Sequence, residues 1–103
     1  ILRFFICLDA GISASVYRGS KTGVYVGLMS NDYLLLQQDR ENTINAYTST
    51  STSFCIAANR ISYLLDLRGP SMTIDTACSS SLTAIHLAIH SLRTGEADIF
   101  LCG

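Results

Sequence analysis

The sequence predicts an α/β protein in which a parallel or mixed sheet is covered by helices on both faces. Strand-like segments at residues 23–29 and 71–74 alternate with helix-like segments at 53–67 and from 82 onward, and such alternation is typical of layered α/β folds. The composition agrees, because 49% of the 103 residues are hydrophobic and only 15% are charged. An average domain has about 25% charged residues, so this chain is rich in core residues.

The first strand is followed by a polar region. Residues 23–29 include valines at positions 24 and 26 and are bounded by glycine, which favours a strand. Ser30-Asn31-Asp32 is typical of a turn. The polar stretch that continues to Thr52 is the best loop candidate.

The next segment, residues 53–67, has the spacing of a helix. Its apolar residues recur at helical intervals: Ile56, Ile61, Leu64 and Leu67. We expect Gly69-Pro70 to end this helix, because proline does not continue one.

A short strand and a long helix follow. Residues 71–74 alternate polar and apolar side chains and include β-branched members, which predicts a short buried strand. Large apolar residues then recur at helical spacing: Leu82, Ile85, Ile89 and Leu92. Alanines and Leu87 fill much of the remaining surface, so we expect a helix buried nearly all round. Gly95 stands where a helix C-terminus favours positive φ.

Cys78 stands between this strand and this helix, in the run DTACSSSL at residues 75–82. A thiol reacts as its thiolate, and the partial positive charge and open N–H groups of a helix N-terminus stabilise an anion. We therefore predict that Cys78 is a nucleophile and that its own backbone N–H contributes to an oxyanion hole. The alternative is a small buried hydrophobe, which is what most free cysteines are.

Charge, hydropathy and cysteine spacing exclude several classes. The net charge is −1 and the basic residues are scattered, so the sequence has no basic patch of the kind that binds nucleic acid. No apolar run reaches the ~18 residues needed to span a bilayer, so we expect no membrane partner and a cytoplasmic location. Cys7, Cys55 and Cys102 form no C-x-x-C pair with each other or with Cys78. We expect these three to be core residues rather than parts of a disulfide framework or a zinc site.

His86 and His90 lie on the predicted second helix, four residues apart. At ~1.5 Å per residue they are ~12 and ~18 Å along the axis from Cys78, too far for proton transfer over ~3 Å. The zinc-protease motif needs a glutamate where Leu87 stands. We expect packed or partner-facing histidines, no metal site and, since no glycine-rich phosphate loop is present, no directly bound cofactor.

Four short motifs follow one another along the chain, and both their order and their spacing carry information: Asn59 to Tyr63, Arg68 to Ser71, Asp75 to Leu82, and Ser91 to Asp98. With Gly23 to Gly27 as an early strand, the series resembles the β-ketoacyl synthase (ketosynthase) domain of polyketide synthases and of multifunctional fatty acid synthases. The resemblance runs from about Asp9 to Gly103, nearly the whole chain. It implies a thiolase-like fold of layered αβαβα type, of which residues 1–103 form part of the N-terminal half only.

The resemblance also implies an activity. Cys78 would hold the acyl chain as a thioester for decarboxylative Claisen condensation with a malonyl-type extender, carried on the phosphopantetheine of an acyl carrier protein. The family is homodimeric, and its two catalytic histidines lie downstream, outside this chain, so the fragment alone is expected to be inactive. The final residues 99–103 are apolar and typical of a buried strand, which agrees with a piece of a longer polypeptide.

Two alternatives remain open. One is a fatty acid synthase ketosynthase of the same fold, such as a free-standing enzyme, although the motif residues around Arg60 and Arg68 favour the multidomain type. The other is a non-catalytic ketosynthase-like dimer partner, against which the retention of Cys78 argues. Ser49 and Ser51 stand where the family usually has glycine, and residues 1–8 carry no charge apart from Arg3. We expect these departures to affect substrate choice and the first helix rather than the nucleophile.

Overall fold

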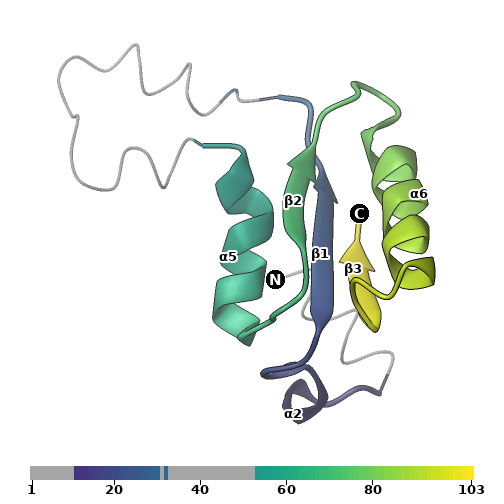
Figure 1. The fold of residues 1–103 in the computed structure, drawn as a ribbon. Helices are drawn as coiled ribbons and strands as arrows, with labels where there is room; N and C mark the ends of the chain where they lie inside the picture. Colours follow the sequence, from purple (N-terminus) through teal and green to yellow (C-terminus); the bar gives the residue numbers. More distant parts are fainter. Residues whose placement is uncertain (1–10, 31, 33–52) are drawn as a thin grey trace, which may run out of the picture.

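The computed structural model describes residues 11–30, 32 and 53–103 (Figure 1). The expectations for Cys7, Ser49, Ser51 and the N-terminal helix, and most of the predicted loop, lie outside these residues. The described elements are α2 (Ala14–Tyr17), β1 (Thr22–Gly27), α5 (Cys55–Leu65), β2 (Ser71–Ile74), α6 (Ser80–Arg93) and β3 (Ile99–Cys102). In these ranges no helix is long and apolar enough to cross a membrane.

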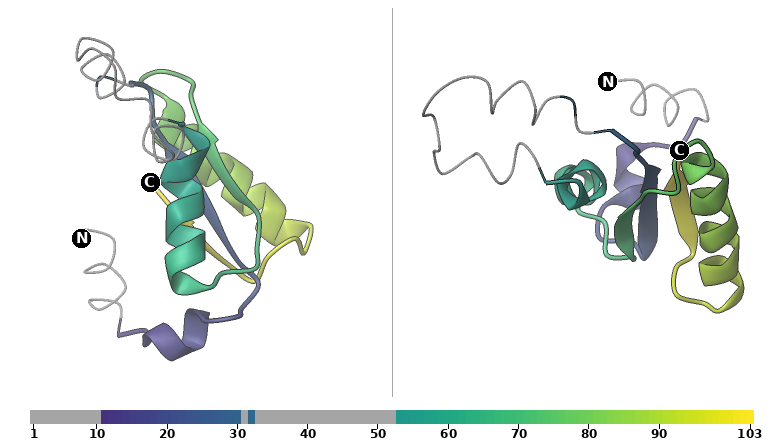
Figure 2. Two further views of the ribbon diagram at one scale, coloured as in Figure 1. Left: turned by 90° about the vertical axis from the view of Figure 1, so that its left-hand side faces the viewer. Right: turned by 90° about the horizontal axis from the view of Figure 1, so that it is seen from above.

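The described strands form one parallel sheet in the order β2-β1-β3. The chain passes from β1 through α5 to β2 at one edge, and then through α6 across β1 to β3 at the other edge. Figure 2 shows α5 and α6 on opposite sides of the sheet. The predicted α/β architecture, with a parallel sheet covered on both faces, is therefore confirmed.

The central strand β1 supplies both halves of the core. Val24 and Val26 face α5 and pack with Ala58, whereas Tyr25 faces α6 and packs with Ala84 and Ala88. This alternation follows from the two-residue period of a strand. The Tyr25 hydroxyl also forms a buried hydrogen bond of 3.0 Å with the Ser91 hydroxyl, which ties the C-terminal half of α6 to the sheet.

Helix α5 ends earlier than expected, at Leu65 rather than Leu67. Asp66 takes a left-handed conformation with φ 52°, its N–H donates to the Tyr63 carbonyl, and the Leu67 N–H donates to the Ser62 carbonyl. This is a Schellman ending. Gly69 serves another purpose, because a Cβ there would lie 2.5 Å from the Thr22 carbonyl carbon. Its missing side chain lets the segment before β2 join β1.

Helix α6 is oriented differently from the expectation. Its buried residues are small (Ser80, Ala84, Ala88 and Ser91), whereas its large residues Leu82, Ile85, Ile89 and Leu92 are exposed, Leu82 to 72%. The expectation of a helix buried nearly all round is wrong for the described chain. The physical reason is that Tyr25 and Phe100 fill the space on this face of the sheet, so α6 approaches with its small residues.

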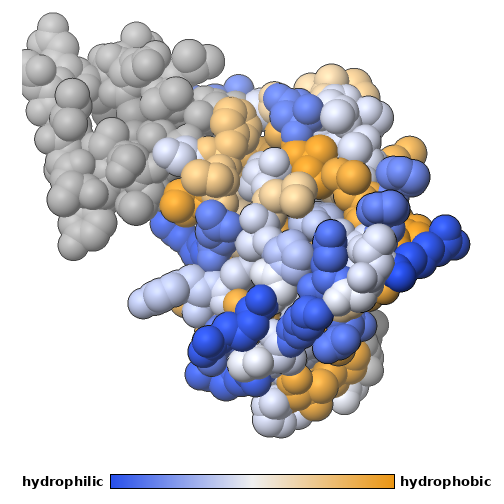
Figure 3. All heavy atoms as spheres, in the orientation of Figure 1, coloured by the Kyte–Doolittle hydropathy of each residue, from blue (hydrophilic) through white to orange (hydrophobic). Residues whose placement is uncertain are grey.

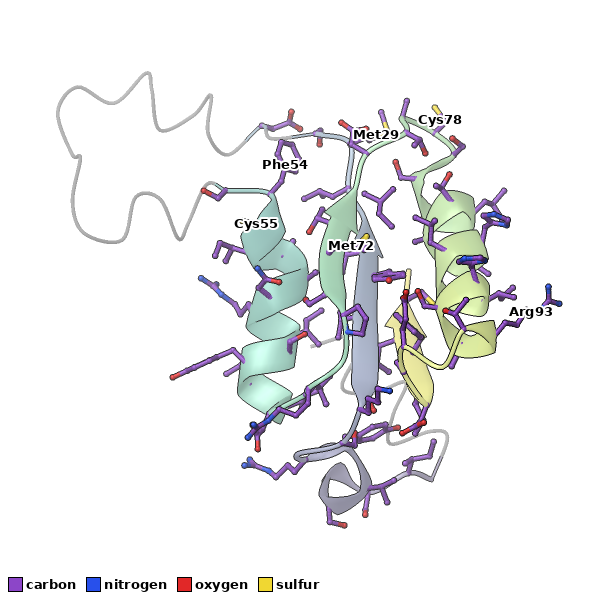
Figure 4. All side chains as sticks on the ribbon, in the orientation of Figure 1. Met29, Phe54, Cys55, Met72, Cys78 and Arg93 are labelled. Carbon is purple, nitrogen blue, oxygen red and sulfur yellow. The ribbon has the colours of Figure 1, made fainter. Side chains whose placement is uncertain are left out.

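Strand β2 has the predicted bounds but is only half-buried. It lies at an edge of the described sheet, and Met72 is 39% exposed. On the face drawn in Figure 3, apolar surface gathers in the upper half, between the two helices. The exposed large apolar residues of the chain include Met29 and Phe54 together with Met72, and Figure 4 labels all three.

Candidate active site

Cys78 lies on the turn that joins the carboxyl end of β2 to the start of α6. Its side chain is exposed and forms no disulfide, so the alternative of a buried hydrophobe does not hold here. Figure 4 shows this turn at the same end of the sheet as Met29, which follows the carboxyl end of β1. Ligands of parallel α/β sheets bind beyond the carboxyl ends of strands, where the strand order changes direction. The predicted series of strand, turn, cysteine and helix is confirmed.

The residue before Cys78 has an unusual backbone. Ala77 has φ 53°, a left-handed conformation that costs an L-residue about 1–2 kcal/mol. The side chains of two neighbours hold this residue from both sides. The Asp75 carboxylate accepts the Ala77 N–H at 3.0 Å, and the Ser80 hydroxyl donates to the Ala77 carbonyl at 2.6 Å. The turn is therefore fixed by side chains as well as by the helix that follows.

A second group of hydroxyls completes the turn. The Ser79 hydroxyl donates to the Thr76 carbonyl at 2.7 Å and to the Thr76 hydroxyl at 2.9 Å. The Thr83 hydroxyl donates to the Ser79 carbonyl at 3.0 Å and shares a hydrogen bond of 3.0 Å with the Thr76 hydroxyl. These hydroxyls hold the turn in place, while the thiol of Cys78 is presented to solvent.

The N-terminus of α6 lacks a usual side-chain cap. Ser79 is the N-cap residue, but its hydroxyl makes no cap hydrogen bond to the first turn of the helix and points back to Thr76 instead. An N-cap side chain normally satisfies one of the open N–H groups there. The Ser79 side chain therefore leaves the N–H groups at the start of α6 uncapped, and such N–H groups can stabilise an anion.

Gly27, the last residue of β1, sets how closely α6 approaches the sheet. A Cβ at this position would lie 2.7 Å from the Ser81 nitrogen and 2.8 Å from the Ser80 carbonyl carbon. Both atoms belong to the backbone, so a side chain here would displace the start of the helix. In the sequence, Gly27 is recognisable only as part of an early strand, and nothing there signals this contact.

The other predicted residues lie away from Cys78 or differ from expectation. His86 and His90 are exposed in the later turns of α6, which fits a partner-facing position and not packing within this chain. Cys55 and Cys102 are also exposed rather than core residues, and Cys55 is the first residue of α5. Across the described ranges, no group of three potential metal ligands lies together.

Comparison with known proteins places the chain among a defined set of enzymes. Residues 7–103 match the family described as "Beta-ketoacyl synthase, N-terminal domain". The chain is 54% identical over 90 residues to the "Hybrid PKS-NRPS synthetase xenE" of Xenoacremonium sinensis, and this match covers 87% of the chain and 2% of that protein. It is 51% identical over 84 residues to the "Mycocerosic acid synthase-like polyketide synthase" of Mycobacterium tuberculosis, covering 82% of the chain and 4% of that protein.

A solved structure gives the same result. The "Ketosynthase from module 6 of the bacillaene synthase from Bacillus subtilis 168" superposes with a TM-score of 0.76 and 44% identity. The match covers 91% of this chain and 15% of that one. The chain therefore spans a small part of the length of each relative.

Proposed function

The chain belongs to the β-ketoacyl synthase family, with a thiolase-like fold as its motifs predicted, and from this premise we propose that it is the nucleophile-bearing part of a polyketide synthase ketosynthase. The observation that carries the proposal is the position of Cys78, exposed on a side-chain-fixed turn at the start of α6. Residues 1–103 would then be one piece of a ketosynthase N-terminal domain, in line with the small share of each relative that they cover.

In the first half-reaction, Cys78 takes the acyl group from a thioester. The thiolate attacks the carbonyl carbon, a new S–C bond forms, and the bond to the donor sulfur breaks. The donor leaves as a thiolate and takes up the proton that Cys78 has lost. Within the described part of the chain, no hydrogen bond engages the Cys78 backbone N–H, so this group is open to bind the carbonyl oxygen as negative charge develops.

In the second half-reaction, a malonyl-type extender on an acyl carrier protein loses CO2. The electron pair that this releases forms a C–C bond to the acyl carbonyl carbon, and the S–C bond to Cys78 breaks. The thiolate of Cys78 is thereby regenerated for the next acyl group. The family's two histidines, which lie outside this chain, would assist this step. The homodimer, the extender and the cytoplasmic location stay predictions.

Two other functions from the same fold are less well supported. The relatives described above are polyketide synthases or hybrids that contain one, which favours a polyketide over a fatty acid product. A non-catalytic dimer partner would have no use for an exposed cysteine on a fixed turn, so the geometry favours catalysis.

The test is to find where the acyl group attaches. The ketosynthase that contains residues 1–103 is incubated with an N-acetylcysteamine hexanoyl thioester, digested, and its peptides are weighed by mass spectrometry. We expect the hexanoyl mass on the peptide with Cys78, and no acylation of Cys78→Ala. Cys55→Ala is the matched control and keeps full loading. An acyl group on another residue, or full loading of Cys78→Ala, contradicts the proposal.

A further inference from the structure

Three serines follow Cys78, Ser79 to Ser81, and the structure gives the first two different surroundings. Ser80 is 5% exposed, and its hydroxyl donates to the Ala77 carbonyl at 2.6 Å while accepting the Thr76 N–H at 3.0 Å. Ser79 is exposed, and among the described residues its hydroxyl bonds only to Thr76. Ser80 therefore connects the peptide group before Thr76 to the peptide group after Ala77, from inside the protein.

The backbone that Ser80 holds leads directly into Cys78. Ala77 has φ 53°, and an alanine left to itself prefers a negative φ. If φ returned to negative values, the peptide group between Ala77 and Cys78 would rotate. That rotation would move both the thiol and the backbone N–H of Cys78 relative to the start of α6. Strained backbone of this kind persists only where the surroundings fix it.

Gly27 lets the start of α6, and Ser80 with it, lie close against β1. The start of α6 lies so close to β1 that a Cβ at Gly27 would meet the backbone of Ser80 and Ser81 at 2.8 and 2.7 Å. Ser80 therefore lies against the sheet, and its hydroxyl bonds to the backbone of the turn above it. The exposed hydroxyl of Ser79 has no such support.

We propose that Ser80 is a positioning residue for the nucleophile: its buried hydroxyl keeps Ala77 left-handed and so fixes the thiol and N–H of Cys78 for attack. The proposal rests on the proposed function, since it assumes that Cys78 is the residue acylated. Ser80 itself touches no substrate. It acts through the geometry of the turn, where a displacement of about 1 Å is enough to slow a reaction up to 10²-fold.

The experiment measures acylation of Cys78 by the hexanoyl thioester in the ketosynthase that contains this chain. Ser80→Ala should lower the maximal acylation rate about tenfold or more, with a smaller change in the half-saturating thioester concentration. Ser81→Ala, the matched control at the exposed serine that follows Ser80, should stay within about twofold. Ser80→Ala combined with Ala77→Gly should recover most of the rate, because glycine adopts positive φ without strain. Lost packing alone would not be rescued at position 77.

A second variant keeps the test decisive if Ser80→Ala does not fold. Ala77→Val changes an exposed residue and disfavours positive φ strongly, because valine is β-branched. It should slow acylation as Ser80→Ala does, while Ala77→Gly should not. Acylation within twofold of the parent for Ala77→Val or Ser80→Ala overturns this inference, as does failure of the Ala77→Gly rescue. If the parent carries the acyl group on another residue, the proposed function itself fails.

Discussion

The starts of α5 and α6 lie at the same end of the sheet, and each has an exposed cysteine, Cys55 and Cys78 (Figure 4). Their surroundings differ. Cys55 is the first residue of its helix, after an N-cap Phe54 that has helical φ and ψ and no side-chain cap hydrogen bond. Cys78 precedes its helix by two residues, on a turn tied together by the side chains around it.

The comparison shows what a helix N-terminus does and does not provide. Its partial positive charge acts over the first turn, so it is available to both cysteines and does not by itself distinguish them. The distinguishing feature is the set of side-chain hydrogen bonds around Cys78, which fixes the backbone of the turn that carries its exposed thiol. At the start of α5, by contrast, the Thr73 hydroxyl donates a side-chain hydrogen bond to the Phe54 carbonyl at 2.8 Å, and Cys55 has no comparable set of bonds around it among the described residues.

The largest expected effect is the difference in turnover between variants of the two cysteines. Cys78→Ala should reduce condensation by the intact synthase by several orders of magnitude, as removal of a nucleophile does, whereas Cys55→Ala should leave it within about twofold. Cys78→Ser should retain little activity, since an alcohol is a weaker nucleophile than a thiolate. Turnover is measured as release of CO2 from the extender together with formation of the ketone product. Equal losses at both cysteines would remove the distinction.

The next largest effect tests the contact that supports the Cys78 turn. Gly27→Ala should move the start of α6, slowing acylation of Cys78 about tenfold and lowering the free energy of unfolding by about 1–3 kcal/mol. Gly23→Ala is the matched control on the same face of β1. A Cβ at position 23 would clash with the Phe100 ring, a side chain, and not with the backbone of α6.

Both glycine variants are expected to lose stability, but only Gly27→Ala should lose acylation rate. Chemical denaturation gives the stability of each variant, and the hexanoyl thioester gives the rate. If the rate falls in proportion to stability in both, the start of α6 has no special role in placing Cys78.

The sequence predicts the order of the elements well, because hydrophobic period and turn residues are local signals. Residues 71–74 form a strand as expected, and Gly95 takes positive φ after α6. The sequence does not predict which side of α6 is buried, since small residues such as Ala84 and Ala88 share the helical period of large ones such as Leu82. Only the bulk of Tyr25 on the facing strand decides between them.

The candidate site was predictable only in part. The placement of Cys78 between a strand and a helix follows from the pattern of residues 71–92. The left-handed Ala77 does not, because alanine carries no signal for positive φ, and the role of Ser80 depends on which of several neighbouring serines is buried. Asp66 shows the same limit at the end of α5, where an aspartate and not a glycine takes the left-handed position.

A smaller effect tests selectivity between the exposed cysteines. Iodoacetamide should label Cys78 several times faster than Cys55 in the intact synthase, because side-chain hydrogen bonds hold the turn that presents the Cys78 thiol to solvent. Peptide mapping after short exposure gives both rates. Unfolding in urea should abolish the difference, since the turn is then lost. Faster labelling of Cys55 in the folded protein would contradict the comparison on which this prediction rests.

The smallest effect is expected at His86 and His90, which are exposed on later turns of α6. At ~1.5 Å per residue, His86 lies ~12 Å along the axis from Cys78, and the influence of a charge on a helix terminus is confined to the nearest turn. His86→Gln and His90→Gln should therefore change the acylation rate of Cys78 by less than about threefold, in contrast to Ser80→Ala on the same helix. A tenfold loss at either histidine would mean that groups far along α6 control Cys78, and that the local turn is not what separates it from Cys55.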